Sequence, residues 1–313
     1  MVGMIILIVG GVLMIGVLTL WLFGERWHPL RRSTWRFLRE GGLGRLLNGS
    51  ALHAYFYGRW TNQYINVLIN RIYPGLDEEG RQRWADHYHG KVLTQEQAHA
   101  IITLNEDIPL RDLEQIIPYP EARDIVLKGP PDVAVYECGC RHARATHCEP
   151  TQVCMIIGQP FVDFVLEHNP LSSRRLSQTE ALELLEAEHN RGHVHSAWFK
   201  DVCLDRFYVI CNCCKCCCGG IEGMTKYGMR LMTSSGYVAQ VDKMLCAACG
   251  TCEDACPFGA IEVDGTAIVS WEMCMGCGVC VGQCPNEAMS LVRDERKGEP
   301  LDVRVLAEME RVA

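Results

Sequence analysis

The feature that most constrains this chain is a pair of cysteine runs with identical spacing near its C-terminal end. Both runs read C-x2-C-x2-C-x3-C-P, and they occupy residues 246–257 and 274–285. This is the spacing of a ligand run for [4Fe–4S] clusters, in which each iron takes one cysteine thiolate. Repeated cysteine pairs also hold structural zinc, but two matching runs that both end in Cys-Pro favour iron–sulfur chemistry. The sequence therefore predicts two [4Fe–4S] clusters.

The fourth cysteine of each run is predicted to serve the cluster of the other run. The first three thiolates share a tight loop, whereas the cysteine before proline has turned away and reaches the second cluster. The predicted ligands of the first cluster are Cys246, Cys249, Cys252 and Cys284, and those of the second are Cys274, Cys277, Cys280 and Cys256. Small residues between them, such as Gly250 and Gly276, let backbone amides approach the cluster because glycine has no Cβ.

Residues 237–292 resemble a bacterial-type 2[4Fe–4S] dicluster ferredoxin domain. The two cysteine runs carry the resemblance, together with short β-type segments at 236–241 and 266–271. The resemblance implies a ferredoxin-like fold in which a ββα unit is repeated about a pseudo-twofold axis.

Composition restricts the compartment and the partners. The chain has 313 residues, 19 cysteines and a formal net charge of −8. This length allows further domains beside the ferredoxin-like region. The acidic balance argues against a nucleic-acid partner, which usually requires a basic surface. A cysteine content this high, much of it in cluster runs, predicts a reducing compartment.

Residues 1–23 contain no charged residue and are predicted to form a transmembrane anchor. At about 1.5 Å per residue, a helix of this length spans the hydrocarbon core of a bilayer. A cleaved signal peptide is the alternative, but a basic start and a small-residue cleavage site are missing. Residues 24–50 form a basic juxtamembrane segment, and excess arginine beside a membrane helix marks the cytoplasmic side. We expect a single-pass protein of the cell (inner) membrane with its bulk in the cytoplasm.

The middle of the chain is predicted to hold a helical domain at 51–131 and a cysteine-rich domain at 132–236. Two segments, 94–97 and 177–180, have the S/T-x-x-E/Q form of a capping box and predict helix starts.

A further helix is expected at 121–127, directly after Pro120. With a C-terminal tail at 293–313, the predicted fold class is α+β. It combines a transmembrane helix, a mainly helical middle region with a cysteine-rich part, and a ferredoxin-like domain.

Ten further cysteines form two groups in the middle region, and such density is typical of metal ligands. They are Cys138, Cys140, Cys148, Cys154, Cys211, Cys213, Cys214, Cys216, Cys217 and Cys218. Two additional [4Fe–4S] clusters would use eight of them, and one cluster would leave several thiols that oxidise easily. A zinc site, or cysteines that are inert or form disulfides, are the alternatives that the sequence leaves open.

From about Thr94 onward the chain is similar to a loosely defined group of "4Fe–4S dicluster domain" proteins. The similarity is carried by a CxCR segment at 138–141, a capped helix that leads to a Val-His pair at 177–195, a CNCCxCC segment at 211–217, and residues 286–293. It implies electron transfer in anaerobic metabolism and assigns no reaction.

Together these features predict a membrane-anchored iron–sulfur protein that relays electrons through two [4Fe–4S] clusters, with one or two further clusters in the middle region. We expect it to be a subunit of a larger redox or respiratory complex. Its expected partners are the membrane and redox proteins, with a quinone as a candidate ligand. No catalytic residue stands out, which favours an electron-transfer subunit of an oxidoreductase over an enzyme. The alternative is a redox enzyme whose unusual active-site cluster, held by the middle cysteines, is fed by the ferredoxin domain.

Overall fold

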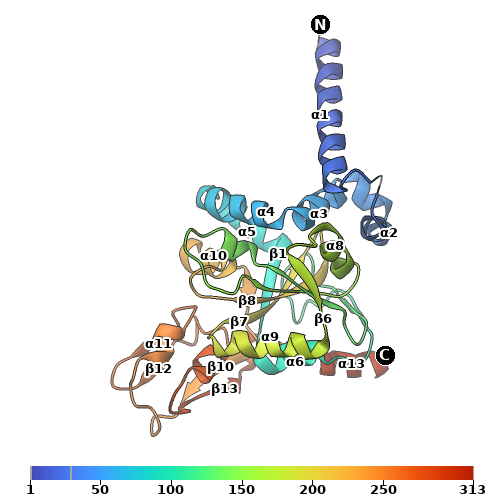
Figure 1. The fold of residues 1–313 in the computed structure, drawn as a ribbon. Coiled ribbons are helices and arrows are strands. Elements are labelled where there is room, and N and C mark those ends of the chain that lie inside the picture. The colour runs from blue at the N-terminus through green and yellow to red at the C-terminus, as the bar shows by residue number, and fades with distance from the viewer. Residues whose placement is uncertain (1, 29, 313) are drawn as a thin grey trace.

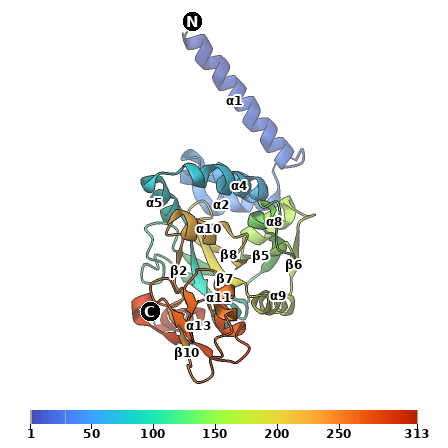
Figure 2. The same ribbon diagram turned by 90° about the vertical axis from the view of Figure 1, so that its left-hand side faces the viewer.

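The computed structural model describes residues 2–28 and 30–312. Met1 of the predicted anchor, Pro29 of the predicted basic segment and Ala313 of the predicted tail lie outside the described residues. A long apolar helix, α1 (Val2–Gly24), projects from one end of the molecule, and the ferredoxin-like region lies at the opposite end (Figures 1 and 2).

Helix α1 is long and apolar enough to cross a membrane. Its apolar stretch, Gly3–Trp21, has 19 residues, and none of it is buried against the rest of the protein. A membrane anchor and an N-terminal signal sequence both fit this description.

The end of α1 is joined to the body through a buried carboxylate. Glu25 accepts hydrogen bonds from the backbone N–H of Arg31 (2.9 Å) and from the hydroxyl of Thr34 (2.7 Å). The Thr34 hydroxyl also lies 2.8 Å from Nε2 of His168, on a separate helix. Because a buried carboxylate needs such partners, these contacts fix the residues that follow α1 onto the body.

A layer of short helices lies on the side of the molecule that faces α1 (Figures 1 and 2). Its elements are α2 (Arg32–Leu47), α3 (Ser50–Arg59), α4 (Thr61–Val67), the π-helical turn η1 (Leu68–Ile72), the 3-10 turn η2 (Tyr73–Gly75) and α5 (Glu78–His87).

The middle region is built around a sheet, with helices on both sides. Within the described residues the sheet has seven strands in the order β6-β4-β5-β8-β7-β1-β9. They are β6 (Ser173–Leu176), β4 (Val133–Glu137), β5 (Gln152–Ile157), β8 (Arg206–Cys213), β7 (Val194–Lys200), β1 (Tyr88–Leu93) and β9 (Met232–Thr233). Neighbouring strands are antiparallel except β1 and β9, which are parallel.

This sheet corrects the expectation of a mainly helical middle region. The fold is a mixture of helices and strands, as the α+β class requires, but the sheet takes strands from both sides of residue 131. Every residue of β7 is buried, and so are all but one of β8. Because both faces are covered, these strands lack the polar–apolar alternation that identifies a half-exposed strand.

The second face of the sheet carries α6 (Gln95–Ile102) and α9 (Gln178–Asn190), which pack against each other. Both predicted capping boxes are confirmed: the side chain of Thr94 accepts from the N–H of Gln97, and the Gln97 side chain accepts from the N–H of Thr94. Ser177 and Glu180 make the same reciprocal pair at the start of α9. The remaining helices of the body are α7 (Gly139–His142), α8 (Phe161–His168), α10 (Gly219–Tyr227) and α13 (Val303–Val312).

The helix predicted at 121–127 is wrong. Its second half is strand β3 (Ile125–Leu127), which pairs antiparallel with β2 (Ile108–Leu110). Ala122 has a φ of 55°, which lies in the left-handed region that a right-handed helix excludes. The carboxylate of Asp124 accepts a hydrogen bond from the N–H of Asp112 at 2.9 Å. These contacts override the helix-start signal.

The C-terminal region consists of two small antiparallel sheets and two short helices. The predicted β-type segments contain β10 and β12. The elements are β10 (Tyr237–Val241) paired with β13 (Met289–Arg293), β11 (Ile261–Val263) paired with β12 (Ala267–Val269), α11 (Thr251–Ala255), α12 (Val279–Gly282) and the 3-10 turn η3 (Glu295–Lys297). This arrangement is consistent with a ferredoxin-like fold.

Candidate metal centres

The eight C-terminal cysteines line two separate cavities, and each cavity combines cysteines from both runs. The first is lined by Cys246, Cys249, Cys252 and Cys284. The second is lined by Cys274, Cys277, Cys280 and Cys256. Each site therefore brings together three cysteines of one run and the fourth cysteine of the other.

Backbone N–H groups donate to four of these sulfurs in two matching pairs. Ala260 donates to Cys256 at 3.2 Å, and Ala288 donates to Cys284 at 3.3 Å. In both cases the donor lies four residues after the cysteine that precedes proline. Across the sheets, the N–H of Ala239 donates to Cys274 at 3.4 Å and that of Ala267 to Cys246 at 3.5 Å. The two halves of the region thus make equivalent hydrogen bonds to their sulfurs, as expected of a pseudo-twofold repeat.

Gly276 shows why a small residue is needed between these cysteines. Its φ is 63°, and a Cβ at this position would lie 2.2 Å from the carbonyl oxygen of Tyr237. Only glycine fits this close approach without moving the strand. At the equivalent position of the first run, Ala248 adopts a similar φ of 52°.

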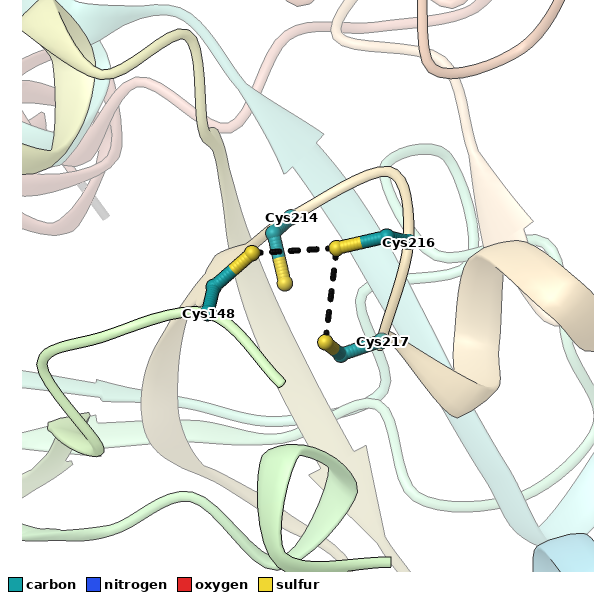
Figure 3. Close-up of side chains that lie close together, drawn as sticks. All are labelled: Cys148, Cys214, Cys216 and Cys217. Atoms are coloured by element: carbon teal, nitrogen blue, oxygen red, sulfur yellow. Dashed lines mark hydrogen bonds between the residues drawn. The ribbon is translucent and has the colours of Figure 1, made fainter. Parts of the chain in front are cut away.

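In the middle region, four cysteines form a tight group, which we call the outer quartet: Cys148, Cys214, Cys216 and Cys217. Their sulfurs all lie within 4.8 Å of one another. Figure 3 shows them pointing toward a common centre, with Cys148 on one loop and the other three on the loop between β8 and α10. The sulfur of Cys216 lies 3.0 Å from that of Cys148 and 3.4 Å from that of Cys217.

The outer quartet has the donor set of a tetrahedral metal ion. A zinc–sulfur bond of about 2.3 Å places neighbouring thiolates about 3.8 Å apart around one ion. The contacts of Cys216 are shorter than this, at 3.0 and 3.4 Å, and no pair of sulfurs in the quartet is more than 4.8 Å apart. Cys214 and Cys217 are buried, whereas Cys216 is exposed, so the group lies at the edge of the body. The quartet is therefore a candidate metal site in the middle region.

The other six cysteines form a closed ring in the interior, which we call the inner ring. Each thiol shifts the pKa of two neighbours, and the order around the ring is Cys138, Cys154, Cys211, Cys213, Cys218 and Cys140. All six line a cavity of about 120 Å³, which is also lined by Cys203, by Cys214 and Cys217 of the quartet, and by residues of α3 and α4. The hydrogen bond with Cys211 lowers the pKa of Cys213 to about 6, which makes Cys213 the ring thiol that most easily becomes a thiolate ligand.

A buried arginine lies between the two cysteine groups. Arg141 is fully buried and pairs with Glu188, which is also buried, at 3.0 Å. Although burial lowers the pKa of Arg141, the nearby sulfurs of Cys214 and Cys138 and the Glu188 carboxylate raise it above its ordinary value. Arg141 thus stays charged and can offset thiolate charge on both groups. The sequence did not identify Glu188, because its partner lies 47 residues away.

The remaining cysteine and the two histidines near β7 belong to neither group. Cys203 also lines the cavity of the inner ring, but no ring thiol is among the groups that shift its pKa, which burial raises to about 12. We therefore assign Cys203 a packing role. His193 lies 2.7 Å from Glu188, and His195 lies 2.7 Å from the amide oxygen of Asn212. Burial lowers the pKa of His195 to about 4, which keeps this ring neutral.

A protein-family model described as "4Fe-4S binding domain" matches residues 239–262 and 267–290. The C-terminal region is accordingly a 4Fe–4S binding domain with two motifs, and this indicates iron–sulfur electron transfer. No curated protein matches the chain.

Proposed function

We propose that this chain is a membrane-anchored iron–sulfur electron-transfer protein and a subunit of a larger redox or respiratory complex. The observation that carries the proposal is the crossed sharing of the eight C-terminal cysteines between two cavities. Clusters at these sites would supply one-electron redox chemistry. The task of the chain is then to hold the centres, set their potentials and bring them close to one another.

In this proposal the first cluster is held by Cys246, Cys249, Cys252 and Cys284, and the second by Cys274, Cys277, Cys280 and Cys256. Hydrogen bonds to the sulfurs, burial and solvent exposure set the potential of such centres. The two sites differ most in exposure, since Cys249 is exposed whereas Cys274 and Cys280 are buried. We expect two distinct reduction potentials.

Direct contacts between the middle region and the 4Fe–4S binding domain support a continuous relay. Lys215, which lies inside the outer quartet's loop, donates from Nζ to the backbone oxygen of Asp254 at 2.8 Å. Asp254 is in α11, between two predicted cluster ligands. On the other side, Nε2 of Gln283 donates to the backbone oxygen of Asn190, at the end of α9, at 3.2 Å. In this proposal one or two further metal centres in the middle region extend the relay.

The anchor half of the proposal rests on how α1 joins the body. Glu25 is fully buried at this junction, so the helix leads directly into folded structure. On α2, Trp35, Leu43 and Leu47 are 62%, 77% and 89% exposed. Exposed apolar residues beside a membrane helix fit the interfacial layer of a bilayer. The bulk would then face the cytoplasm of a single-pass protein of the cell (inner) membrane.

The basic segment has a second role in this arrangement. Arg36 pairs with Asp163 at 2.7 Å, and Arg31 lies 3.7 Å from Glu167. Part of the arginine charge therefore holds the segment on the body instead of facing lipid. Redox proteins remain the proposed partners, and a quinone at the membrane face remains a candidate ligand.

The test uses the full-length protein, purified without oxygen and reduced stepwise. Cys249→Ser and Cys277→Ser should each abolish the EPR signal of one cluster and leave the other, because each removes a ligand of a different site. Cys203→Ala is the matched control, since Cys203 belongs to no cysteine group, and it should keep both signals. If both signals survive either serine variant, the ligand assignment is wrong.

A second candidate function is a redox enzyme whose active site is a cluster of the middle region. The observation that favours it is the cavity of the inner ring, which is also lined by the apolar side chains of Phe37, Phe161 and Phe164. A small molecule bound there would perturb the spectrum of a middle centre. Candidate substrates that leave this spectrum unchanged would argue for electron transfer alone.

A further inference from the structure

We propose that the two cysteine groups of the middle region are sites of different nuclearity: the inner ring binds a polynuclear iron–sulfur cluster, and the outer quartet binds one tetrahedral metal ion. This inference rests on the proposed function, which it deepens by dividing the ten middle cysteines into six and four. The division is not visible in the sequence, where the two sets are interleaved.

The loop between β8 and α10 separates the two sets. Cys213 belongs to the ring and Cys214 to the quartet, and the same alternation recurs at Cys217 and Cys218. The loop closes on itself through a hydrogen bond from the N–H of Cys218 to the carbonyl oxygen of Cys214 at 3.2 Å. This turn directs adjacent side chains to opposite sides of the loop, so that one loop supplies ligands to two sites.

The spacing of the sulfurs distinguishes one ion from a cluster. Thiolates around a single tetrahedral ion lie about 3.8 Å apart, each near all the others. The quartet is a group of mutually close sulfurs of this kind, since all four lie within 4.8 Å of one another. The six ring cysteines instead line one cavity of about 120 Å³, and within the described residues only the quartet forms a group of mutually close sulfurs. A ring of donors fits a cluster, which takes its thiolates on its periphery with one bound to each iron.

The ring holds more donors than either kind of site needs. One tetrahedral ion takes four thiolates, and a [4Fe–4S] cluster also takes four, one for each iron, so both leave two ring thiols without a metal. A cluster carries more positive charge and takes its thiolates on its periphery, which suits ligands spread around a cavity. Arg141 lies next to Cys138 on the ring side and Cys214 on the quartet side, where its charge offsets thiolates of both sites.

The surroundings of the ring resemble those of the two C-terminal sites. Backbone N–H groups of Arg141, Gly219 and Ile221 lie near the sulfurs of Cys138, Cys140 and Cys218, respectively. Hydrogen bonds from N–H groups to sulfur are what an iron–sulfur site uses to stabilise its negative charge.

Gly219 and Gly220 let two large side chains pack beside the ring. A Cβ on Gly219 would lie 2.5 Å from Ile69, and one on Gly220 would lie 2.6 Å from Trp198, whereas the distance from each to a ring sulfur, 3.6 Å, is an ordinary contact. The two glycines therefore hold the start of α10 close to Ile69 and Trp198, next to Cys140 and Cys218.

The experiment measures iron, acid-labile sulfide and zinc per chain on anaerobically purified full-length protein, with Mössbauer spectra of the ⁵⁷Fe-enriched form. We expect about eight irons for the C-terminal sites, at least about four more in the ring, and one additional zinc or iron with four sulfur ligands. Cys154→Ser and Cys211→Ser should remove the ring iron and keep the single ion. Cys148→Ser and Cys216→Ser should remove the single ion and keep the ring iron.

The controls separate the possible failures. Cys203→Ala should keep every metal, and retention of both C-terminal EPR signals will show that a ring variant has folded. A quartet variant that loses about four irons would mean that the quartet holds a cubane, which overturns the division. Wild-type protein with about eight irons and both C-terminal signals would overturn the ring cluster while leaving the proposed function intact. Absence of the C-terminal signals from the wild type would instead overturn the proposed function.

Discussion

The two cysteine-rich regions of this protein specify their candidate sites in different ways. In the C-terminal region, three cysteines of each site come from one short loop and the fourth from the other run. In the middle region, the inner ring gathers cysteines from β5, β8 and the starts of α7 and α10. Cysteines that share one short loop can be grouped from the sequence alone. Cysteines that come from several strands and helices can be grouped into a site only when the fold is known.

The crossed arrangement offers the sharpest way to break this comparison, and it carries the largest expected effect. Cys284→Ser should lose the same EPR signal as Cys249→Ser, although Cys284 belongs to the second run. Cys256→Ser should likewise match Cys277→Ser. Each variant should lose up to about four irons per chain, since a cubane that lacks one thiolate is readily lost or degraded. If Cys284→Ser instead matched Cys277→Ser, the sites would be strictly local.

The buried pair Arg141–Glu188 gives the next largest effect and is specific to the middle region. Arg141→Met removes a charge that lies 3.0 Å from a buried carboxylate. Loss of one partner of a buried pair costs about 3–5 kcal/mol, and Arg191 and His193, which also contact Glu188, place the expected loss near the lower end. Urea unfolding of the anaerobic protein measures it.

The matched control is Arg174→Met. Arg174 pairs with Glu180 at 2.8 Å, but both side chains are about half exposed, so its loss should cost at most about 1 kcal/mol. If the two substitutions lowered the free energy of unfolding equally, the buried pair of Arg141 would stabilise the protein no more than an exposed pair does. A loss of metal from both cysteine groups in Arg141→Met, with the C-terminal clusters retained, would agree with its position between them.

Local signals in the sequence predicted local structure well. The capping boxes at Thr94 and Ser177 and the β-type segments at 236–241 and 266–271 all occur as expected, because each depends on residues close together in the chain. The grouping of the eight C-terminal cysteines around two cavities matches the predicted ligand sets, whereas cluster binding by these residues stays a prediction.

Features that depend on contacts between distant residues could not be predicted from the sequence. The central sheet could not be predicted because β7 buries His195, Ser196 and Lys200 beside apolar residues. Its sequence therefore lacks the alternating pattern of a half-exposed strand. The division of the middle cysteines could not be predicted because Cys213 and Cys214 are adjacent in sequence but belong to different groups. The run of adjacent cysteines at 213–214 and 217–218 is the one sequence signal that could have suggested this division. It can be interpreted in this way only once β8 is known to end at Cys213.

The smallest expected effect tests how exact the internal repeat of the C-terminal region is. Gly276→Ala places a Cβ at a φ of 63° and 2.2 Å from the carbonyl oxygen of Tyr237, whereas Gly250 has a φ of 81° and no atom within 4 Å of its Cβ position. A left-handed conformation costs a non-glycine residue about 1–3 kcal/mol. We expect Gly250→Ala near the lower end of this range, and Gly276→Ala near the upper end because the strand must also move.

Urea unfolding and the EPR signal of the second cluster measure the two effects together. Since Ala248 already occupies the position equivalent to Gly276 in the first run, the repeat by itself would allow alanine there. An unchanged EPR signal of the second cluster in Gly276→Ala would mean that β10 can move to accommodate the Cβ. It would also mean that position 276 accepts alanine as position 248 does. Loss of stability confined to Gly276→Ala would mean that the second site is held more tightly against the rest of the protein, as the burial of Cys274 and Cys280 suggests.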